Sequence, residues 1–137
     1  VIALLSYNNF GSSSFPEAKK VSEAVDFLHR MHPDLIVDGP VQSDFALNNE
    51  MLEERFPFSG LNKRKVNTLI FPNLDAANIT YKIIKELDNT LSIGPILMGL
   101  KHPAHILQLG ASVDEIVNMS AIAVIDAQEK QKLKKSK

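Results

Sequence analysis

The chain has 137 residues, of which 45% are hydrophobic, and it contains no cysteine. Its length and apolar content are those of one folded domain with a substantial core, which excludes an intrinsically disordered chain. The absence of cysteine excludes both a disulfide framework and a cysteine nucleophile. The formal net charge is −1, but the charges are unevenly distributed.

The positive charges gather at the end of the chain. All acidic residues lie at or before Glu129, and we interpret residues 129–137 as a solvated basic tail. Removing its five lysines takes the formal charge of the rest of the chain from −1 to −6. An acidic body argues against nucleic acid as a partner, although contact between the tail and an anion stays an open alternative. The five are Lys130, Lys132, Lys134, Lys135 and Lys137.

We expect no signal peptide in Val1–Leu5 and no membrane-spanning segment in this sequence. Val1–Leu5 is too short for a signal peptide, and no apolar run approaches the roughly 20 residues that span a bilayer. We therefore expect a cytoplasmic protein with no membrane partner. Because the chain begins on an apolar run without methionine, we also expect it to be a fragment of something longer.

The first third of the chain predicts a strand, a loop and a helix. Val1–Leu5 is expected to be a buried strand, and the Ser/Asn/Gly-rich residues 6–14 a loop. Pro16 suits the first turn of a helix, and Pro33 ends it. Apolar residues recur three or four positions apart in between, at Ala18, Val21, Ala24, Val25, Leu28 and Met31.

The next stretch repeats this alternation. Leu35–Val37 is expected to be a strand that residues 38–40 close. A helix from about Ser43 to Arg55 follows, and residues 57–65 form a loop with a basic triplet at its end. The residues of this helix expected to face inward are Phe45, Met51 and Leu52.

Residues 67–119 organise the rest of the chain. Thr68–Phe71 predicts a buried strand closed by a proline, and the spacing from Leu74 to Leu87 predicts a helix. Ile93–Met98 predicts a second buried strand. The resulting order βαβαβαβα is typical of an α/β domain with a mostly parallel sheet and flanking helices. Ligands bind at the carboxyl ends of such strands, which directs attention to residues 72–75 and 99–110.

The last helix begins with a capping box and continues with an unusual apolar run. Ser112 and Glu115 have the Ser-x-x-Glu spacing that satisfies amide donors at a helix start. Met119–Ile125 has one polar residue in seven, so this helix needs burial on nearly every face. We expect it to pack against a missing part of the chain or against another subunit, as a homodimer or a higher oligomer.

The residues alone leave the chemistry undecided. The loop at 6–14 can offer amides and hydroxyls to a phosphate or carboxylate, and an ordinary turn is the alternative. Ser6, Ser12 and Ser13 lack the context of a nucleophile elbow, which argues against a hydrolase triad.

Histidines and carboxylates give no stronger signal. His102 and His105 have only Glu115 as a third metal ligand nearby in the sequence, so we predict no metal site. Asp38 and Asp75 follow strands, where catalytic carboxylates often lie, but loop and cap roles are open for both.

Five stretches of the chain form one recognisable pattern in order: LLSYNNFGSS at 4–13, VDGPVQSDFALN at 37–48, LIFPNLDAANI at 69–79, IGPILMGL at 93–100 and VDEIVN at 113–118. Together these stretches resemble the phosphate acetyl/butyryltransferase family. The resemblance covers about residues 1–128 and is nearest to the transferase-like C-terminal domain of bacterial NADP-dependent malic enzymes. It implies a two-lobed fold like that of isocitrate/isopropylmalate dehydrogenases, with this chain as the second half and its last helix packed on a missing first lobe.

The resemblance also shows where the chain departs from an active transferase. The family has Ser-Arg-Gly-Cys before the last helix and a catalytic Asp on its first turn, where the arginine stabilises charge and the Asp serves as base for the CoA thiol. The matching positions here are Gln108, Leu109, Gly110, Ala111 and Glu115. Leucine cannot donate to an oxyanion, so we expect no catalytic residue and no acetyl transfer.

The resemblance implies that the cleft that binds acetyl-CoA in the transferases can be retained here and serve as an acetyl-CoA sensor. The whole enzyme implied by the resemblance would use NADP and a divalent metal in its absent N-terminal region, with neither held by this fragment. A working phosphate acetyltransferase, and a dimerisation module without ligand, are the alternatives. The predicted effector-binding residues are Ser6, Asn8, Asn9, Gly11, Ser12, Ser13, Lys101 and Gln108.

Overall fold

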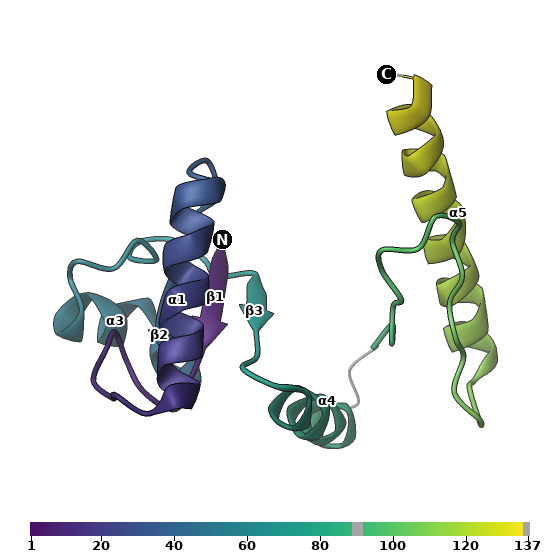
Figure 1. The fold of residues 1–137 in the computed structure, drawn as a ribbon. Helices are drawn as coiled ribbons and strands as arrows, with labels where there is room; N and C mark the ends of the chain where they lie inside the picture. The colour runs from purple at the N-terminus through teal and green to yellow at the C-terminus, as the bar shows by residue number, and fades with distance from the viewer. Residues whose placement is uncertain (89–91, 136–137) are drawn as a thin grey trace. The chain divides into compact units, whose positions relative to one another are not determined.

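A computed structural model describes residues 1–88 and 92–135 of the chain (Figure 1). It divides into two compact units, Val1–Lys82 and Ile83–Lys137, and each is considered by itself. Within residues 1–88 and 92–135, no helix is long and apolar enough to cross a membrane.

The first unit is built on a three-stranded parallel sheet. The central strand is β1 (Ile2–Leu5), with β2 (Val37–Val41) on one side and β3 (Thr68–Ile70) on the other. Both neighbours run parallel to β1. The predicted α/β class with a parallel sheet and flanking helices is therefore confirmed.

Helix α1 (Pro16–Met31) covers one face of this sheet (Figure 1). Its Val21 and Val25 pack in one cluster with Leu4 of β1 and Val37 of β2. The predicted helix is confirmed, and its apolar stripe is confirmed at Ala18, Val21, Val25 and Leu28. Two further residues of the predicted stripe are exposed, Ala24 and, in the last turn, Met31 at 59%.

The opposite face is covered by α2 (Ser43–Leu47) and α3 (Asn49–Arg55). The prediction of one continuous helix was wrong because Asn48 leaves the helical conformation and caps α3, accepting hydrogen bonds from the backbone N–H groups of residues 50 and 51 at 3.1 Å each. Of the residues expected inward, Leu52 is fully buried, whereas Met51 is 37% exposed since the break resets the helical phase. The core on this side is Ala3, Leu5, Val41, Ala46, Leu52 and Leu61.

Strand β2 begins and ends later than predicted. Leu35 and Ile36 precede it and are exposed, while residues 38–40, expected to close the strand, continue it. The reason is Gly39, whose φ is +146° and whose absent Cβ would lie 2.5 Å from the carbonyl oxygen of Leu4. The two strands can approach only at a glycine here, and the register shifts at this point.

The last strand and helix of the first unit were both predicted, but the strand is more exposed than expected. Strand β3 lies at the sheet edge, and its Ile70 is 48% exposed instead of buried. Helix α4 (Leu74–Asp88) agrees with the predicted helix and continues beyond Lys82, the last residue of the first unit. Asn73 caps it by accepting a hydrogen bond from the N–H of Ala76 at 2.9 Å.

In the second unit the predicted strand Ile93–Met98 is absent. These residues form no strand, because a β conformation needs a partner and none of the described strands pairs with them. Helix α5 (Val113–Lys135) extends through most of the segment predicted as a basic tail. Its predicted capping box is confirmed: Ser112 N–H donates to Glu115 Oε2 at 2.8 Å, and Glu115 N–H donates to Ser112 Oγ at 3.2 Å.

Candidate functional site

Three loops leave the sheet of the first unit at the same edge. Because β1, β2 and β3 are parallel, their carboxyl ends lie side by side, which is where α/β sheets bind ligands. The loop after the central strand is residues 6–14, the predicted effector loop, and residues 42 and 71–73 follow its two neighbours.

A pair of amides fixes the effector loop to the end of β2. Asn9 Nδ2 donates to Gln42 Oε1 at 2.6 Å, and the N–H of Gln42 donates back to Asn9 Oδ1 at 2.8 Å. Gln42 Nε2 also donates to the carbonyl oxygen of Tyr7 at 2.8 Å. Both polar ends of the Asn9 side chain are therefore engaged, so Asn9 shapes the loop, and its role in binding an effector stays a prediction.

The serines of the loop also form internal hydrogen bonds. Ser12 Oγ accepts from the N–H of Asn9 at 3.1 Å, and Ser12 N–H donates to the Asn9 carbonyl at 2.9 Å. Ser13 Oγ lies 2.8 Å from the hydroxyl of Tyr7. Gly11, at φ +85°, closes the turn. The ordinary-turn interpretation thus accounts for much of this pattern.

Asn8 is the exception in the loop. The residue is only 5% exposed, its Oδ1 accepts from Ser6 Oγ at 2.5 Å, and its Nδ2 has no hydrogen-bond partner among the described residues. Leaving a buried amide donor unpaired costs about 1–3 kcal/mol. Asn8 is therefore the predicted effector residue with an unused donor at the sheet edge.

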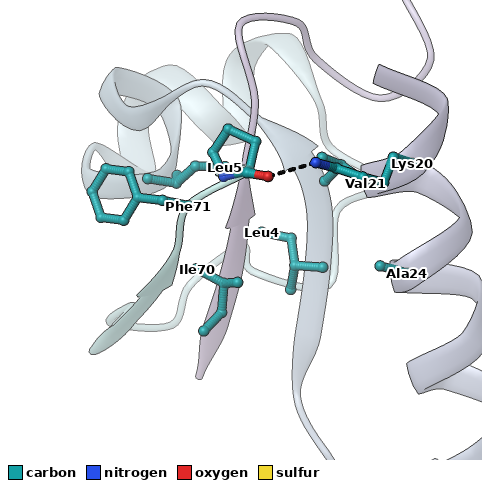
Figure 2. Close-up of a pocket in the computed structure, with 8 residues that line it drawn as sticks. Leu4, Leu5, Lys20, Val21, Ala24, Ile70 and Phe71 are labelled. Carbon is teal, nitrogen blue, oxygen red and sulfur yellow. Dashed lines mark hydrogen bonds between the residues drawn. The ribbon is translucent and has the colours of Figure 1, made fainter. Parts of the chain in front are cut away.

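An apolar pocket of about 220 Å³ lies between α1 and the strands β1 and β3. Figure 2 shows Leu4 and Ile70 on the sheet side and Ala24 on the helix side. Lys20 Nζ donates to the carbonyl oxygen of Pro72 at 2.7 Å at one end of the pocket, drawn as the dashed line in Figure 2. This hydrogen bond links α1 to the loop that follows β3.

The positions that match the transferase motif lie in the second unit. Leu109, at the place of the family's arginine, is fully exposed in a turn closed by a hydrogen bond from Ala111 N–H to the carbonyl oxygen of Gln108 at 3.1 Å. Lys101 is also exposed. The expectation that Lys101 and Gln108 face the loop at 6–14 across one cleft stays a prediction.

Glu115 is strongly tied to its neighbours. Lys85 Nζ donates to its Oε1 at 2.9 Å, and the N–H of Ser112 donates to its Oε2. The hydrogen bond from Lys85, followed by that from the Ser112 N–H and by the charge of Lys85, lowers the pKa of Glu115 from 4.5 to about 2. A general base works best with a pKa near the operating pH, so Glu115 is a poor acceptor for the proton of a thiol.

Two other candidate groups from the sequence, Asp38 and His105, differ in their hydrogen bonds. Asp38 Oδ2 accepts from Ser59 Oγ at 2.9 Å and from Gly60 N–H at 2.8 Å, which fixes a loop. His105 borders a second cavity in the second unit, and neither ring nitrogen has a partner among the described residues. Among residues 1–88 and 92–135, no group of three His, Asp or Glu side chains lies close enough together to hold a metal ion.

Three important residues were missed by the sequence analysis. Gln42 fixes the effector loop, Lys20 binds the turn after β3, and Lys85 lowers the pKa of Glu115. Gln42 could have been found from the rule for strand ends, had the end of β2 been placed correctly. Lys85 precedes Glu115 by 30 residues, and no local pattern links the two.

The geometry defines an α/β domain whose loops gather at the carboxyl edge of a parallel sheet. A family model described as phosphate acetyl/butaryl transferase matches residues 1–124, and the chain belongs to that family. An NADP-dependent malic enzyme from Escherichia coli is 41% identical over 93% of this chain, which spans 17% of that enzyme.

Phosphate acetyltransferases are similar as well. One from Clostridium acetobutylicum is 36% identical over 93% of the chain, which spans 38% of its length. The crystal structure of a phosphotransacetylase from Streptococcus pyogenes matches with a TM-score of 0.86 and 38% identity, covering 93% of this chain and 39% of that one. The predicted resemblance to both groups of proteins is therefore confirmed.

Proposed function

We propose that the chain is the regulatory and oligomerising C-terminal domain of an NADP-dependent malic enzyme, and that it senses acetyl-CoA without transferring acetyl groups. The parent enzyme decarboxylates malate oxidatively to pyruvate in a region outside this chain, where NADP and a divalent metal bind. A cytoplasmic location is part of the same proposal. The support comes from the 41% identity to malic enzymes and from the degenerate transferase motif.

The exposed Leu109 carries the argument against acetyl transfer. An oxyanion in acyl transfer is stabilised by donors aimed at the developing charge, and losing one such donor costs about 10²–10³ in kcat. A leucine side chain has no donor at all. The low pKa of Glu115 adds to this, because its proton affinity is far below that of a thiolate.

An assay of CoA acetylation by acetyl phosphate tests this part of the proposal. We expect no turnover by the intact protein, with a known phosphate acetyltransferase as the positive control. The specific observation that favours a working transferase is the 36–38% identity to proteins of that name, so the assay decides between the two. Turnover near that of the control would overturn the claim of lost activity.

The sensing role rests on the effector loop and its unpaired Asn8 amide. Acetyl-CoA bound there shifts malic enzyme activity through a coupling on the order of 1–3 kcal/mol, equivalent to about 5- to 150-fold in affinity. In the intact enzyme we expect Ser12→Ala and Lys101→Ala to weaken the response to acetyl-CoA and to leave effector-free malate turnover nearly intact. Lys19→Ala, an exposed lysine of α1, is the matched control. If all three variants respond to acetyl-CoA as the wild-type enzyme does, any effector binds elsewhere.

The remaining alternative is a dimerisation module without a ligand. Self-association is expected in either case, because Val124 and Ile125, in the apolar run Met119–Ile125 of α5, are each more than half exposed. Light scattering should show a dimer or larger species, and a monomer would contradict this. Titration calorimetry with acetyl-CoA then separates a sensor, which releases or absorbs heat on binding, from a purely structural module.

A further inference from the structure

The effector loop contains a turn whose first central residue is unusually bulky. Ser12 N–H donates to the carbonyl oxygen of Asn9 at 2.9 Å and closes the turn, so Phe10 and Gly11 are its central residues. Both have positive φ, +40° at Phe10 and +85° at Gly11. Glycine, asparagine and aspartate dominate such turns, because a larger side chain is strained in this conformation. A phenylalanine at this position therefore needs a compensating contact.

The ring of Phe10 makes that contact. It lies against the ring of Phe56, with centroids 4.9 Å apart, and meets Phe58 edge to face at 5.2 Å. Phe56 in turn packs edge to face on Phe45, and both pack against the core of the first unit. The N–H of Phe10 also donates to the carbonyl oxygen of Pro40 at 2.7 Å. The turn is thus tied to β2 through its backbone and to the end of α3 and the following loop through its ring.

The loop that carries Phe58 is fixed by Asp38. The Asp38 carboxylate accepts a hydrogen bond from the Ser59 hydroxyl at 2.9 Å and another from the next N–H along the chain at 2.8 Å. Phe58 itself is 70% exposed, so its ring gains little from burial. Its ring contacts among the described residues are with Phe10 and Phe56. These contacts give the Phe58 ring one use, which is to hold Phe10.

We propose that Phe10, held by the rings of Phe56 and Phe58, is the residue that positions the effector loop for binding acetyl-CoA. The inference rests on the proposed sensing function and adds the residues that set the shape of its site. Phe10 lies within the predicted effector residues at 8–13, so its backbone conformation sets the directions of the groups on both sides. Preorganising a loop raises affinity, because less conformational freedom is lost on binding. Asp38 then supports the site from a distance, by fixing the loop that carries the Phe58 ring.

Titration calorimetry of the intact protein with acetyl-CoA tests this role. We expect Phe58→Ala to weaken binding about two- to tenfold, the range that corresponds to one aromatic pair. Phe58→Tyr, which keeps the ring, should bind acetyl-CoA as the wild type does. Phe27→Ala is the matched control, because it removes a phenylalanine of α1 that is 53% exposed. This control should leave the affinity unchanged.

A double-mutant cycle shows whether Phe58 acts through Phe10. Phe10→Ala should weaken binding at least as much as Phe58→Ala, and combining the two should cause no further loss, since the contact is already absent. Hydrogen exchange of the bonded amides of Phe10 and Ser12 should be faster in Phe58→Ala than in the wild type. Urea denaturation should give nearly the same free energy of unfolding for Phe58→Ala and the wild type. Weakened binding at unchanged stability distinguishes a positioning residue from a residue that only supports the fold.

The outcomes separate this inference from the function on which it rests. If acetyl-CoA binds the wild type and Phe58→Ala equally, the inference is overturned and the sensing role stands. If the losses caused by Phe58→Ala and Phe10→Ala simply add, Phe58 does not act through Phe10 and the inference is again overturned. If acetyl-CoA does not bind the wild type, the proposed function falls and the inference falls with it.

Discussion

The two units differ in how they use similar apolar residues. Of the buried apolar residues in the described chain, all except Met119 belong to the unit Val1–Lys82. In that unit the apolar stripe of α1 meets β1 and β2. In the unit Ile83–Lys137, the runs Ile93–Met98 and Met119–Ile125 line one cavity together, but many of their large apolar side chains stay exposed, among them Met98 and Val124. Apolar content alone therefore does not create a core, because a core needs two complementary faces.

The units also differ in what fixes their local structure. The first unit has a close-packed core around Leu52 and Leu61, both almost wholly buried. In the second unit, polar contacts fix the start of α5: the capping box of Ser112 and Glu115, and the ion pair of Glu115 with Lys85. We therefore expect core truncations to matter most in the first unit, and loss of a cap or charge to matter in the second.

The largest effect is expected from Leu52→Ala. It removes a side chain that is 1% exposed, and such truncations cost about 2–5 kcal/mol because a cavity remains. Leu87→Ala, at a residue of α4 that is 82% exposed, should change the free energy of unfolding by less than about 0.5 kcal/mol. Urea denaturation followed by circular dichroism measures both. An equal loss of unfolding free energy in the two variants would contradict this difference between the units.

Gly39→Ala should come next. The new Cβ would meet the carbonyl oxygen of Leu4 at 2.5 Å in a backbone with φ of +146°, so β1 and β2 must separate. Backbone strain of this kind costs about 1–3 kcal/mol. The matched control is Gly99→Ala in the second unit, where φ is +85° but no atom lies within 4 Å of the new Cβ. A smaller loss at Gly39 than at Gly99 would contradict the close approach of the two strands.

Ser112→Ala tests the second unit directly. It removes the hydroxyl that accepts a hydrogen bond from Glu115 N–H at 3.2 Å and should cost about 1 kcal/mol of helix stability. Hydrogen exchange over residues 113–117 measures the resulting fraying. Ser120→Ala is the control, since that hydroxyl only donates to the carbonyl oxygen of Ile116, inside the helix. Unchanged exchange in the Ser112 variant would mean that the cap contributes nothing.

The smallest effect concerns pH. The folded pKa of Glu115 is lowered to about 2 from 4.5, so its ionised form stabilises the second unit above pH 4.5, and this contribution is lost as the pH falls towards 2. Glu115→Gln should therefore destabilise α5 at pH 7, and the difference from the wild type should shrink between pH 4.5 and 2. Helicity measured across that range checks the sign. A difference that grows on acidification would refute the pairing with Lys85.

The sequence by itself determined the features that depend on neighbours in the chain. The apolar spacing of α1, the capping box of Ser112 and Glu115, and the alternation of strands with helices all follow from local periodicity. The resemblance to the transferase family was likewise visible in five stretches of sequence, and it located Leu109 where the family has arginine. None of these depends on contacts between distant parts of the chain.

The tertiary structure alone decided what depends on distant partners. Strand β2 runs through Gly39 because β1 approaches it closely there, and Ile93–Met98 forms no strand because no described strand pairs with it. The hydrogen bonds between Asn9 and Gln42 join residues 33 positions apart, and the pKa of Glu115 depends on a lysine 30 positions away. Strand limits, loop shape and proton affinity are set by such contacts, because pairing and electrostatic fields act through space and leave no local pattern in the sequence.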